Sequence, residues 1–325
     1  MKRFKAIAGV LLMFVISAFA LVMIYDKGKD QKPLRYADVP QETIDWINSL
    51  SDGLDDIAAT FTPEPIPTPW DNEGDLGKDD GTGLKTLEDE LFIFYFTESL
   101  TKQAYKCQKY AHQAIPRLEE IIGKYYYPAD MNGRKVAIYL MPDQQEFDKI
   151  TSILFGEEIS KEGVEGVTVQ TISPSGTYLK GIVLNGKYCF KNDEHTKTVL
   201  WHEMTHYCHI SSLDYNMEID MPKWCTEGLA DYVGEDGKRP TFTEKEIAMM
   251  RQDCDFTKSY FPYEFENYEG GHSIFCYMED EYTLEGVKRF LKTTYTNKIS
   301  PSFEIALSKP MKEFEREWKS QLERW

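Results

Sequence analysis

The sequence predicts an α+β fold, in which a small β-sheet precedes one buried helix and a mainly helical C-terminal part follows. Apolar or alternating segments at 135–141, 163–172 and 178–184 are typical of β-strands. A segment without Pro or Gly at 193–210, apolar at its centre, is typical of a buried helix. The segments after Pro222 have helical spacing, so strands and helices are segregated along the chain, which favours the α+β class.

The part of the chain before the first of these strands is predicted to be helical. Residues 84–126 have helical spacing, and Pro116 marks a point at which such a helix could break. Asp143 is a natural N-cap, so we expect a helix through Phe155 directly after the strand at 135–141.

The residues after the strands are predicted to form a turn and then helices. The Asn-Gly pair at 185–186 is a turn signal. Pro222 is expected to begin a helix, because proline suits the first helical turn. Residues 84–325 are predicted to form one domain. Its C-terminal helices are placed at 222–233, 243–252, 267–281, 284–295 and 310–323.

The N-terminus has the pattern of a membrane-spanning segment. Residues 1–5 carry three cations, and the next nineteen residues, 6–24, carry no charge. This length just spans the hydrocarbon core of a bilayer, and the cations predict a cytoplasmic N-terminus. A cleaved signal peptide is the alternative, since residues 18–20 form a small-x-small site. Because the apolar run continues to Tyr25, we expect residues 1–25 to be an uncleaved signal anchor.

Residues 26–83 are predicted to be a tether. Residues 42–59 have apolar positions at helical spacing and predict a short amphipathic helix. Residues 60–83 are rich in Pro, Gly and Asp, and four prolines within seven residues favour an extended linker. A recognition segment for a proline-binding partner is the alternative. The sequence thus predicts a single-pass protein of the cell membrane with its domain outside the cell, or a secreted protein if the site at 18–20 is cleaved.

The charge of the chain excludes one class of partner. The 325 residues carry a formal net charge of −17. Without the first five residues, 34 Lys and Arg stand against 54 Asp and Glu, a net charge of −20. A surface this acidic repels phosphate, so we expect no nucleic-acid partner.

The cysteines do not indicate a metal site. Six of them are scattered along the chain without the paired spacing of a zinc ribbon. Outside the cell they could form up to three disulfides, whereas a buried free thiol is an equally good interpretation for Cys208 and Cys276, which lie in apolar helical segments. The sequence predicts no particular pairing.

A His-Glu-x-x-His motif, formed by His202, Glu203 and His206, lies within the helix expected at 193–210. Residues four apart share one face of a helix, so the two imidazoles can bind one metal ion. Glu203 lies on the flank of that ion, where its carboxylate can take a proton from an activated water. The alternative is a buried helix with two structural histidines.

A catalytic zinc site needs a third protein ligand. His209 shares a helix face with His202, but it lies about 10 Å further along the helix axis, too far to bind the same ion. Glu227 follows in the next helix, after enough residues for the chain to turn back. Asp231 lies one turn after Glu227, where its carboxylate can accept a hydrogen bond from a ligating histidine. Glu227 is therefore the favoured ligand, with an exposed acid near a helix start as the alternative.

These motifs resemble those of a known family. The HExxH sequence at 202–206 and the WxxEGLAxY sequence at 224–232 are similar to those of gluzincin zinc metallopeptidases, specifically the bacterial peptidase-MA-like group. Weaker similarity at 268–277 and 314–318 extends the resemblance over roughly residues 90–325. It implies a zincin-like metallopeptidase fold, a Zn²⁺ cofactor and a peptide or protein substrate. The residues that it implies are His202, His206 and Glu227 as zinc ligands and Glu203 as the general base.

Two further residues are candidates for stabilising the oxyanion of the transition state. Tyr268 and His272 lie four residues apart on the helix expected at 267–281, with Gly270 and Gly271 between them as a flexible point. Related zinc peptidases use a Tyr or a His in this role. Ordinary aromatic packing is the alternative for both residues.

The function expected from the sequence is that of an exported, membrane-anchored zinc peptidase. An extended peptide could pair with a strand edge at 164–171 or at 178–184, and the sequence leaves open which. A surface binding or scaffolding protein on a peptidase-like fold is one alternative, and a zinc amidase with a non-protein substrate is another. The sequence does not predict the oligomeric state.

Overall fold

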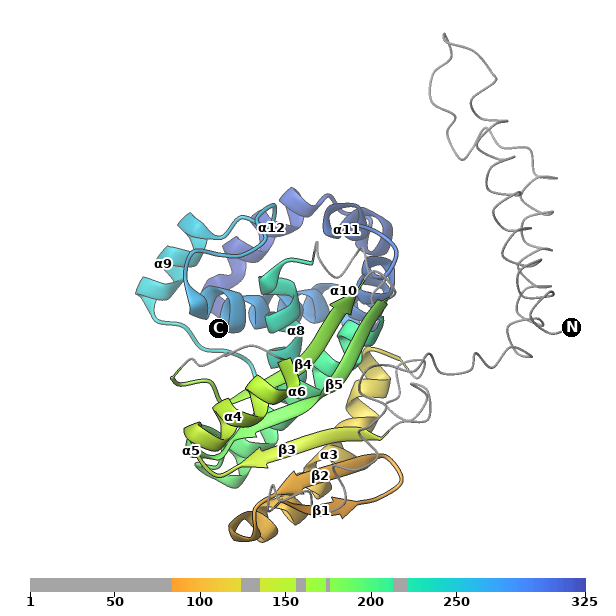
Figure 1. The fold of residues 1–325 in the computed structure, drawn as a ribbon. Helices are drawn as coiled ribbons and strands as arrows, with labels where there is room; N and C mark the ends of the chain where they lie inside the picture. Colours follow the sequence, from red (N-terminus) through yellow and green to blue (C-terminus); the bar gives the residue numbers. More distant parts are fainter. Residues whose placement is uncertain (1–83, 124–134, 156–161, 174–175, 213–220) are drawn as a thin grey trace, which may run out of the picture. The chain divides into compact units, whose positions relative to one another are not determined.

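The computed structural model describes the chain from Leu84 to its end, apart from four short gaps (Figure 1). The described residues belong to a compact unit that extends from Gly74 to Trp325. The predicted signal anchor at 1–25, the helix at 42–59 and the linker at 60–83 lie outside them. The described ranges are 84–123, 135–155, 162–173, 176–212 and 221–325.

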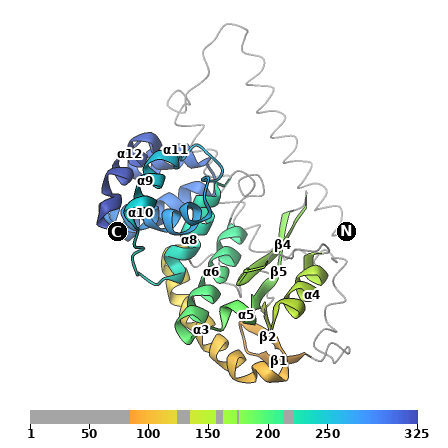
Figure 2. The same cartoon turned by 90° about the vertical axis from the view of Figure 1, so that its left-hand side faces the viewer.

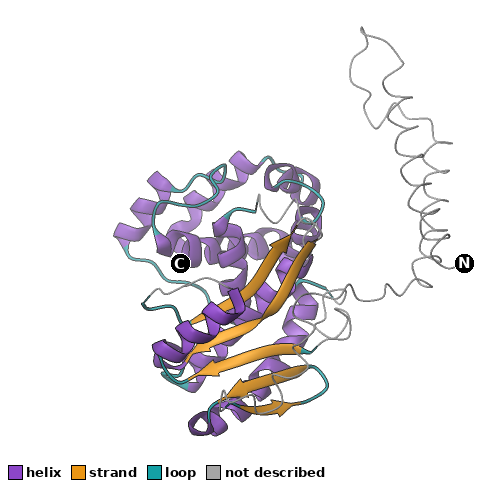
Figure 3. Ribbon diagram, viewed as in Figure 1, coloured by secondary structure: helices purple, strands orange, loops and turns teal. Residues whose placement is uncertain are grey.

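The described residues form a mixed α/β structure, with one small sheet and more helix than strand (Figure 3). The order of strands in the sheet is β1-β2-β3-β5-β4. The strands are β1 (Lys85–Glu88), β2 (Phe92–Phe96), β3 (Val136–Met141), β4 (Gly166–Ser173) and β5 (Gly176–Asn185).

The helices fall into two groups, one that packs with the sheet and one that follows it. The first group is η3 (Glu98–Leu100), α3 (Thr101–Ile121), α4 (Gln144–Phe155), α5 (Gly186–Cys189) and α6 (Asp193–Ser212). The second group is α8 (Lys223–Gly234), α9 (Glu244–Asp253), η6 (Glu266–Gly270), α10 (Gly271–Thr294), α11 (Ile299–Leu307), α12 (Met311–Gln321) and η7 (Leu322–Arg324).

β4 forms one edge of the sheet. Strands β2, β3 and β5 run parallel, whereas β1 and β4 are antiparallel to their single neighbours. β5 lies between β3 and β4, so its edges are both paired. Of the two strands that the sequence offered to an extended peptide, β4 is therefore the one at an edge.

Helices cover both faces of the sheet. Since side chains alternate between the faces along each strand, a single strand contributes residues to the core on each side. Phe92 and Phe94 of β2 join the core on the side of α3 and α6, whereas Tyr95 joins the core on the side of α4 (Figure 2). On the first side, the indole Nε1 of Trp201 in α6 donates a hydrogen bond to the carbonyl of Tyr110 in α3 at 2.9 Å. The helix that carries the His-Glu-x-x-His motif is thus fixed between the sheet and α3.

The first two strands correct a prediction. The sequence pattern predicts a helix over the whole of 84–126, but residues 85–96 form β1 and β2. All five residues of β2 are aromatic or β-branched, which favours a strand. The carboxylate of Asp89 accepts a hydrogen bond from the amide of Phe92 at 2.9 Å and so stabilises the turn between the strands. Pairing of β2 with β3, which is distant in sequence, then decides the conformation.

Three local features of the first helices are now defined. α3 continues through Pro116, whose ring is exposed, so that water can satisfy the carbonyl that loses its partner. The amide of Glu146 donates to Asp143 at 3.0 Å, which confirms Asp143 as the N-cap of α4. The predicted turn at Asn185 begins the short helix α5, because the Asn185 side chain caps it by accepting from the amide of Lys187 at 3.2 Å.

The C-terminal helices differ from prediction in their boundaries. The helices expected at 267–281 and 284–295 form one helix, α10, interrupted at Thr283, whose φ of 64° lies in the left-handed region. The π-helical turn η6 precedes it. Pro222 is the N-cap of α8 rather than its first residue. Helix α11 is not predicted from the sequence.

None of the six cysteines forms a disulfide, and each is buried. All six cysteines are therefore buried thiols, which is the alternative that the sequence offered for Cys208 and Cys276.

The predicted location of the protein requires a correction. No helix in the described part of the chain is long and apolar enough to cross a membrane, since long helices such as α10 carry charged side chains along their length. This finding stands against the predicted single-pass protein with an external domain. The segment at 6–24, on which that prediction depended, lies outside the described residues.

Helices α8 and α10 meet at a pair of glycines. A Cβ on Gly271 would lie 2.3 Å from the carbonyl oxygen of Trp224, and a Cβ on Gly228 would lie 2.3 Å from the carbonyl carbon of Gly271. Gly270 and Gly271 both have helical backbone angles. The sequence analysis expected a flexible point at Gly270 and Gly271. The structure instead accounts for the glycine at 271 by close packing of its backbone against α8.

Replacing Gly271 tests this contact. Gly271→Ala should lower the free energy of unfolding by about 2–3 kcal/mol, because the new methyl group meets backbone atoms that have no free rotation. Gly270→Ala is the matched control, since its nearest neighbour is the flexible Met250 side chain at 3.3 Å, and it should be close to neutral. Urea unfolding curves measure both, and equal stabilities of the two variants would contradict the contact.

Candidate metal centre

Helices α6 and α8 place three ligand atoms around one point. His202 and His206 lie one turn apart on α6, and Glu227 projects from α8, which packs against α6. The Nε2 atoms of the two histidines are 3.0 Å apart. Oε2 of Glu227 lies 3.2 Å from Nε2 of His206 and 3.4 Å from Nε2 of His202. Within the described ranges, this triad is the one group of His, Cys, Asp or Glu side chains close enough together to hold a metal ion.

The donor set fits zinc. Bonds of about 2.0–2.1 Å in a tetrahedron place the ligand atoms about 3.3–3.4 Å apart. The three separations in the triad, from 3.0 to 3.4 Å, are close to this value. Two imidazoles and one carboxylate form a catalytic type of zinc site, which leaves a fourth position for water or substrate.

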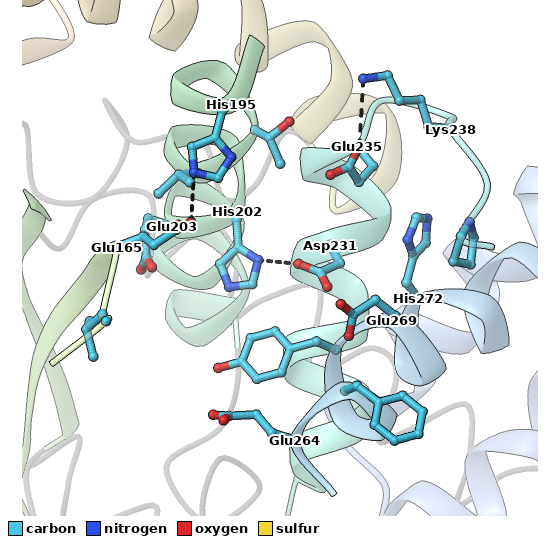
Figure 4. A pocket seen from close by; sticks show the side chains of 18 of the residues that line it. Glu165, His195, His202, Glu203, Asp231, Glu235, Lys238, Glu264, Glu269 and His272 are labelled. Atoms are coloured by element: carbon cyan, nitrogen blue, oxygen red, sulfur yellow. Dashed lines mark hydrogen bonds and ion pairs between the residues drawn. The ribbon is translucent and has the colours of Figure 1, made fainter. Parts of the chain in front are cut away.

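Asp231 holds His202 in the orientation that a metal requires. Nδ1 of His202 donates a hydrogen bond to Oδ1 of Asp231 at 2.7 Å (Figure 4), and Nε2 of the same ring faces the other two members of the triad. Burial opposes protonation of His202, but its hydrogen bonds with Asp231 and Glu227 outweigh burial and raise its pKa well above the usual value. The carboxylate of Asp231 thus sets both the direction and the basicity of the imidazole.

Glu227 is held in its ionised form. Burial alone would raise the pKa of its carboxyl group. Its hydrogen bonds with His202 and His206 outweigh that effect and hold the pKa well below the usual range. A charged oxygen is therefore ready to bind a cation.

Glu203 points toward the edge strand. The hydroxyl of Thr168 in β4 lies 2.9 Å from Oε2 of Glu203 and 2.8 Å from its carbonyl oxygen, and it can donate to either. A Cβ on Gly166 would lie 2.9 Å from Cγ of Glu203, so this glycine leaves room for the side chain. Sequence reasoning missed Thr168 and Gly166, because no motif links residues this far from the HExxH helix, and strand pairing alone brings them there.

Tyr268 lies against the histidine pair. Its ring stacks on that of His202, with centroids 6.0 Å apart and planes inclined by 14°. It belongs to η6, and π-helical turns are frequent at functional sites. Burial, followed by the charges of Glu227 and Glu203, raises the pKa of its hydroxyl. The hydroxyl therefore remains a hydrogen-bond donor at neutral pH.

His272 lies further from the triad. Figure 4 shows it on the other side of Asp231 from His202. It is 3% exposed, and its ring lies edge-on to that of Tyr232. Burial lowers its pKa to about 4. Of the two predicted oxyanion donors, Tyr268 is the one that the structure brings into contact with a ligand of the triad.

His209 is a core residue behind the triad. It is 1% exposed, and its ring packs 6.2 Å from that of Tyr295. Neither of its nitrogens belongs to the triad, and neither has a hydrogen-bond partner among the described residues. Burial, followed by the charge of His206, lowers its pKa to about 3.

A cavity of about 1070 Å³ opens beside the triad. Glu203, Tyr268 and His202 line it together. It extends to residues 162–166 at the start of β4 and to residues 238–241 after α8. The volume lies just above the range for ligand pockets, about 300–1,000 Å³.

Comparisons with known proteins give a limited likeness. No protein-family model and no curated protein matches the chain, so the predicted gluzincin family remains a prediction. Among solved structures, the chain is similar to a crystal structure of a two-domain M1 zinc metallopeptidase mutant bound to L-arginine, at 10% identity and a TM-score of 0.40. The match covers 74% of this chain and 51% of that one, so this chain spans about half the length of that protein. A likeness this distant carries no argument about function, which depends on the site itself.

Removing the Asp231 carboxylate should weaken zinc binding. Asp231→Asn should lower zinc affinity by about 10–100-fold, because loss of a hydrogen-bonded carboxylate reduces the basicity of the histidine ligand. Competition with a chromophoric chelator measures the affinity. Asp193→Asn, an exposed acid at the start of the same helix, should leave it unchanged. Equal affinities of the two variants would contradict the role of Asp231.

The buried state of His209 predicts how stability depends on pH. Its folded pKa of about 3 lies below its unfolded value of about 6.5. The unfolded chain therefore binds the proton first, so stability from neutral His209 is present above pH 6.5 and is lost as pH falls toward 3. His209→Phe should reduce the decrease in melting temperature that the wild type shows between pH 6.5 and pH 4. Ile305→Leu, a control at an exposed residue without a titratable group, should not change that dependence.

Proposed function

We propose that the chain is a zinc-dependent peptidase in which Glu203 is the general base. The observation that carries the proposal is the convergence of His202, His206 and Glu227 on one point, with Glu203 held beside them by Thr168. Structural zinc sites use four protein ligands, whereas three ligands and an adjacent carboxylate are typical of hydrolytic sites. A zinc ion held by the three side chains would supply the Lewis acidity that lowers the pKa of water and polarises the substrate carbonyl.

Glu203 is proposed to move the proton. Its carboxylate accepts the proton from the attacking water and then donates it to the leaving amine. The hydrogen bond from Thr168 limits the rotation of Glu203, and the absence of a side chain at Gly166 leaves space for it. The base is therefore held in one orientation before substrate arrives.

Tyr268 is proposed to stabilise the oxyanion. Its ring is fixed by stacking on His202, and its hydroxyl keeps its proton at neutral pH. A donor fixed in advance stabilises developing negative charge without reorganisation.

The edge strand β4 is proposed to bind the substrate. An extended peptide can add to β4 through main-chain hydrogen bonds. Gly166 of β4 lines the cavity, and Thr168 of the same strand contacts Glu203. A peptide along β4 would thus pass close to the general base.

The decisive variant is Glu203→Gln. It should keep zinc, because Glu203 is not one of the three ligands, and it should lower kcat by about 10²–10⁴-fold, because the amide cannot accept the proton. Metal analysis measures the zinc content, and cleavage of a quenched peptide library measures activity. Glu90→Gln, at an exposed acid, is the matched control and should retain both.

Two outcomes would overturn the proposal. A folded protein that holds no zinc after incubation with the metal would exclude the metal site. A zinc-loaded protein that cleaves no peptide, with Glu203→Gln identical to the wild type in binding, would favour a binding protein instead.

A further inference from the structure

One end of the cavity is an acidic recess next to the triad. It is formed by Glu235 at the end of α8, Glu269 on η6 and His272 on α10 (Figure 4). Asp231, which holds His202, separates this recess from the metal ligands. A group bound in the recess would therefore lie on the other side of Asp231 from the triad.

The lysine and arginine that line the cavity pair mainly with acids outside it. Lys238 forms its shorter ion pair with Glu194, outside the cavity, and a longer one, at 3.9 Å, with Glu235 of the recess. Arg239 pairs with Glu279 and Asp280, also outside the cavity. The acidic residues that line the cavity are Glu162, Glu165, Glu203, Asp231, Glu235, Glu264 and Glu269.

The carboxylates of the recess repel one another. Burial, followed by the charge of Asp231, raises the pKa of Glu269, and Glu235 adds to this effect. Glu269 forms no ion pair with a cation among the described residues, so those residues do not relieve this repulsion. A positively charged group from a ligand would relieve it.

His272 supplies an independent indication of the ligand. It is 3% exposed, and its Nε2 has no hydrogen-bond partner in the described part of the chain. Its ring hydrogen-bonds the backbone of Lys238, and because burial keeps the ring neutral at neutral pH, its second nitrogen is an acceptor. A buried acceptor without a donor is costly, so the recess is suited to a ligand that brings an N–H group.

We propose that this recess binds the protonated side chain of a Lys or Arg in the substrate, so that the protein prefers peptides with a basic residue close to the scissile bond. The inference rests on the proposed peptidase function and names its substrate class. Glu235 and Glu269 provide the charge, and His272 provides the neutral acceptor. An ammonium or guanidinium group donates several hydrogen bonds and carries the charge that the recess lacks.

A calcium ion is the competing occupant, and the donor set disfavours it. Calcium prefers six to eight oxygen ligands. An imidazole nitrogen in place of an oxygen suits a hydrogen-bond donor better than this hard cation.

Binding to a catalytically inactive protein tests the proposal without relying on cleavage. In zinc-loaded Glu203→Gln, a single Lys is moved along an uncharged, fluorescent hexapeptide, and each peptide is compared with its Gln counterpart. At one position, Lys should bind about tenfold more tightly than Gln, as expected for a charge-assisted contact. Adding Glu269→Gln should reduce this ratio to near one, and adding Glu235→Gln should reduce it in part. Raising the salt concentration should also reduce it.

The matched control is Glu304→Gln, which makes the same charge change at an exposed residue outside the cavity and should keep the ratio. Equal binding of Lys and Gln peptides at every position would overturn the proposal, as would a preference that survives both Glu269→Gln and Glu235→Gln. Stoichiometric calcium binding that is lost in Glu269→Gln would assign the recess to a metal instead. Cleavage by the wild type without any Lys preference would overturn this inference alone, whereas Lys-selective binding without cleavage would overturn only the peptidase function.

Discussion

The hydrogen bond between His202 and Asp231 is the constraint on which the rest of the site depends. It joins α6 to α8 at 2.7 Å and decides which nitrogen of His202 faces the other ligands. Without it, the imidazole could rotate and present either nitrogen. Because Asp231 lies one turn from Glu227, the same helix supplies both the third ligand and the group that orients the first.

The packing of α8 explains how such a short helix can hold that position. A Cβ on Gly234 would lie 3.0 Å from the carbonyl of Thr198, so α8 approaches α6 closely at one end. In the middle of α8, Gly228 meets Gly271 of α10. Helices that pack backbone to backbone have little freedom to slide, because any shift creates a clash. The spacing of the three atoms in the triad is thus a result of the packing of α8 against both α6 and α10.

The sequence predicted the proximity of His202, His206 and Glu227 better than it predicted the residues around them. His202 and His206 follow helical spacing, which is a local property that a sequence displays directly. Thr168 reaches Glu203 only through the pairing of β4 with β5, and no local pattern encodes that register. The same reason explains why β1 and β2 were predicted as helix: β2 depends on pairing with β3, more than forty residues later, and β1 depends on pairing with β2. Local periodicity predicts helices and their motifs, whereas sheet neighbours are decided by tertiary packing.

The buried thiols provide an internal means of following motion around the site. Cys208 lies two residues after His206, and Cys225 lies two residues before Glu227. Burial raises the pKa of the Cys208 thiol to about 12, and burial also raises that of Cys225, so both react slowly while the helices are closed. The rate at which a thiol reagent modifies them therefore reports how often α6 and α8 open. The two helices that hold the triad thus each carry a native chemical probe of their own local unfolding.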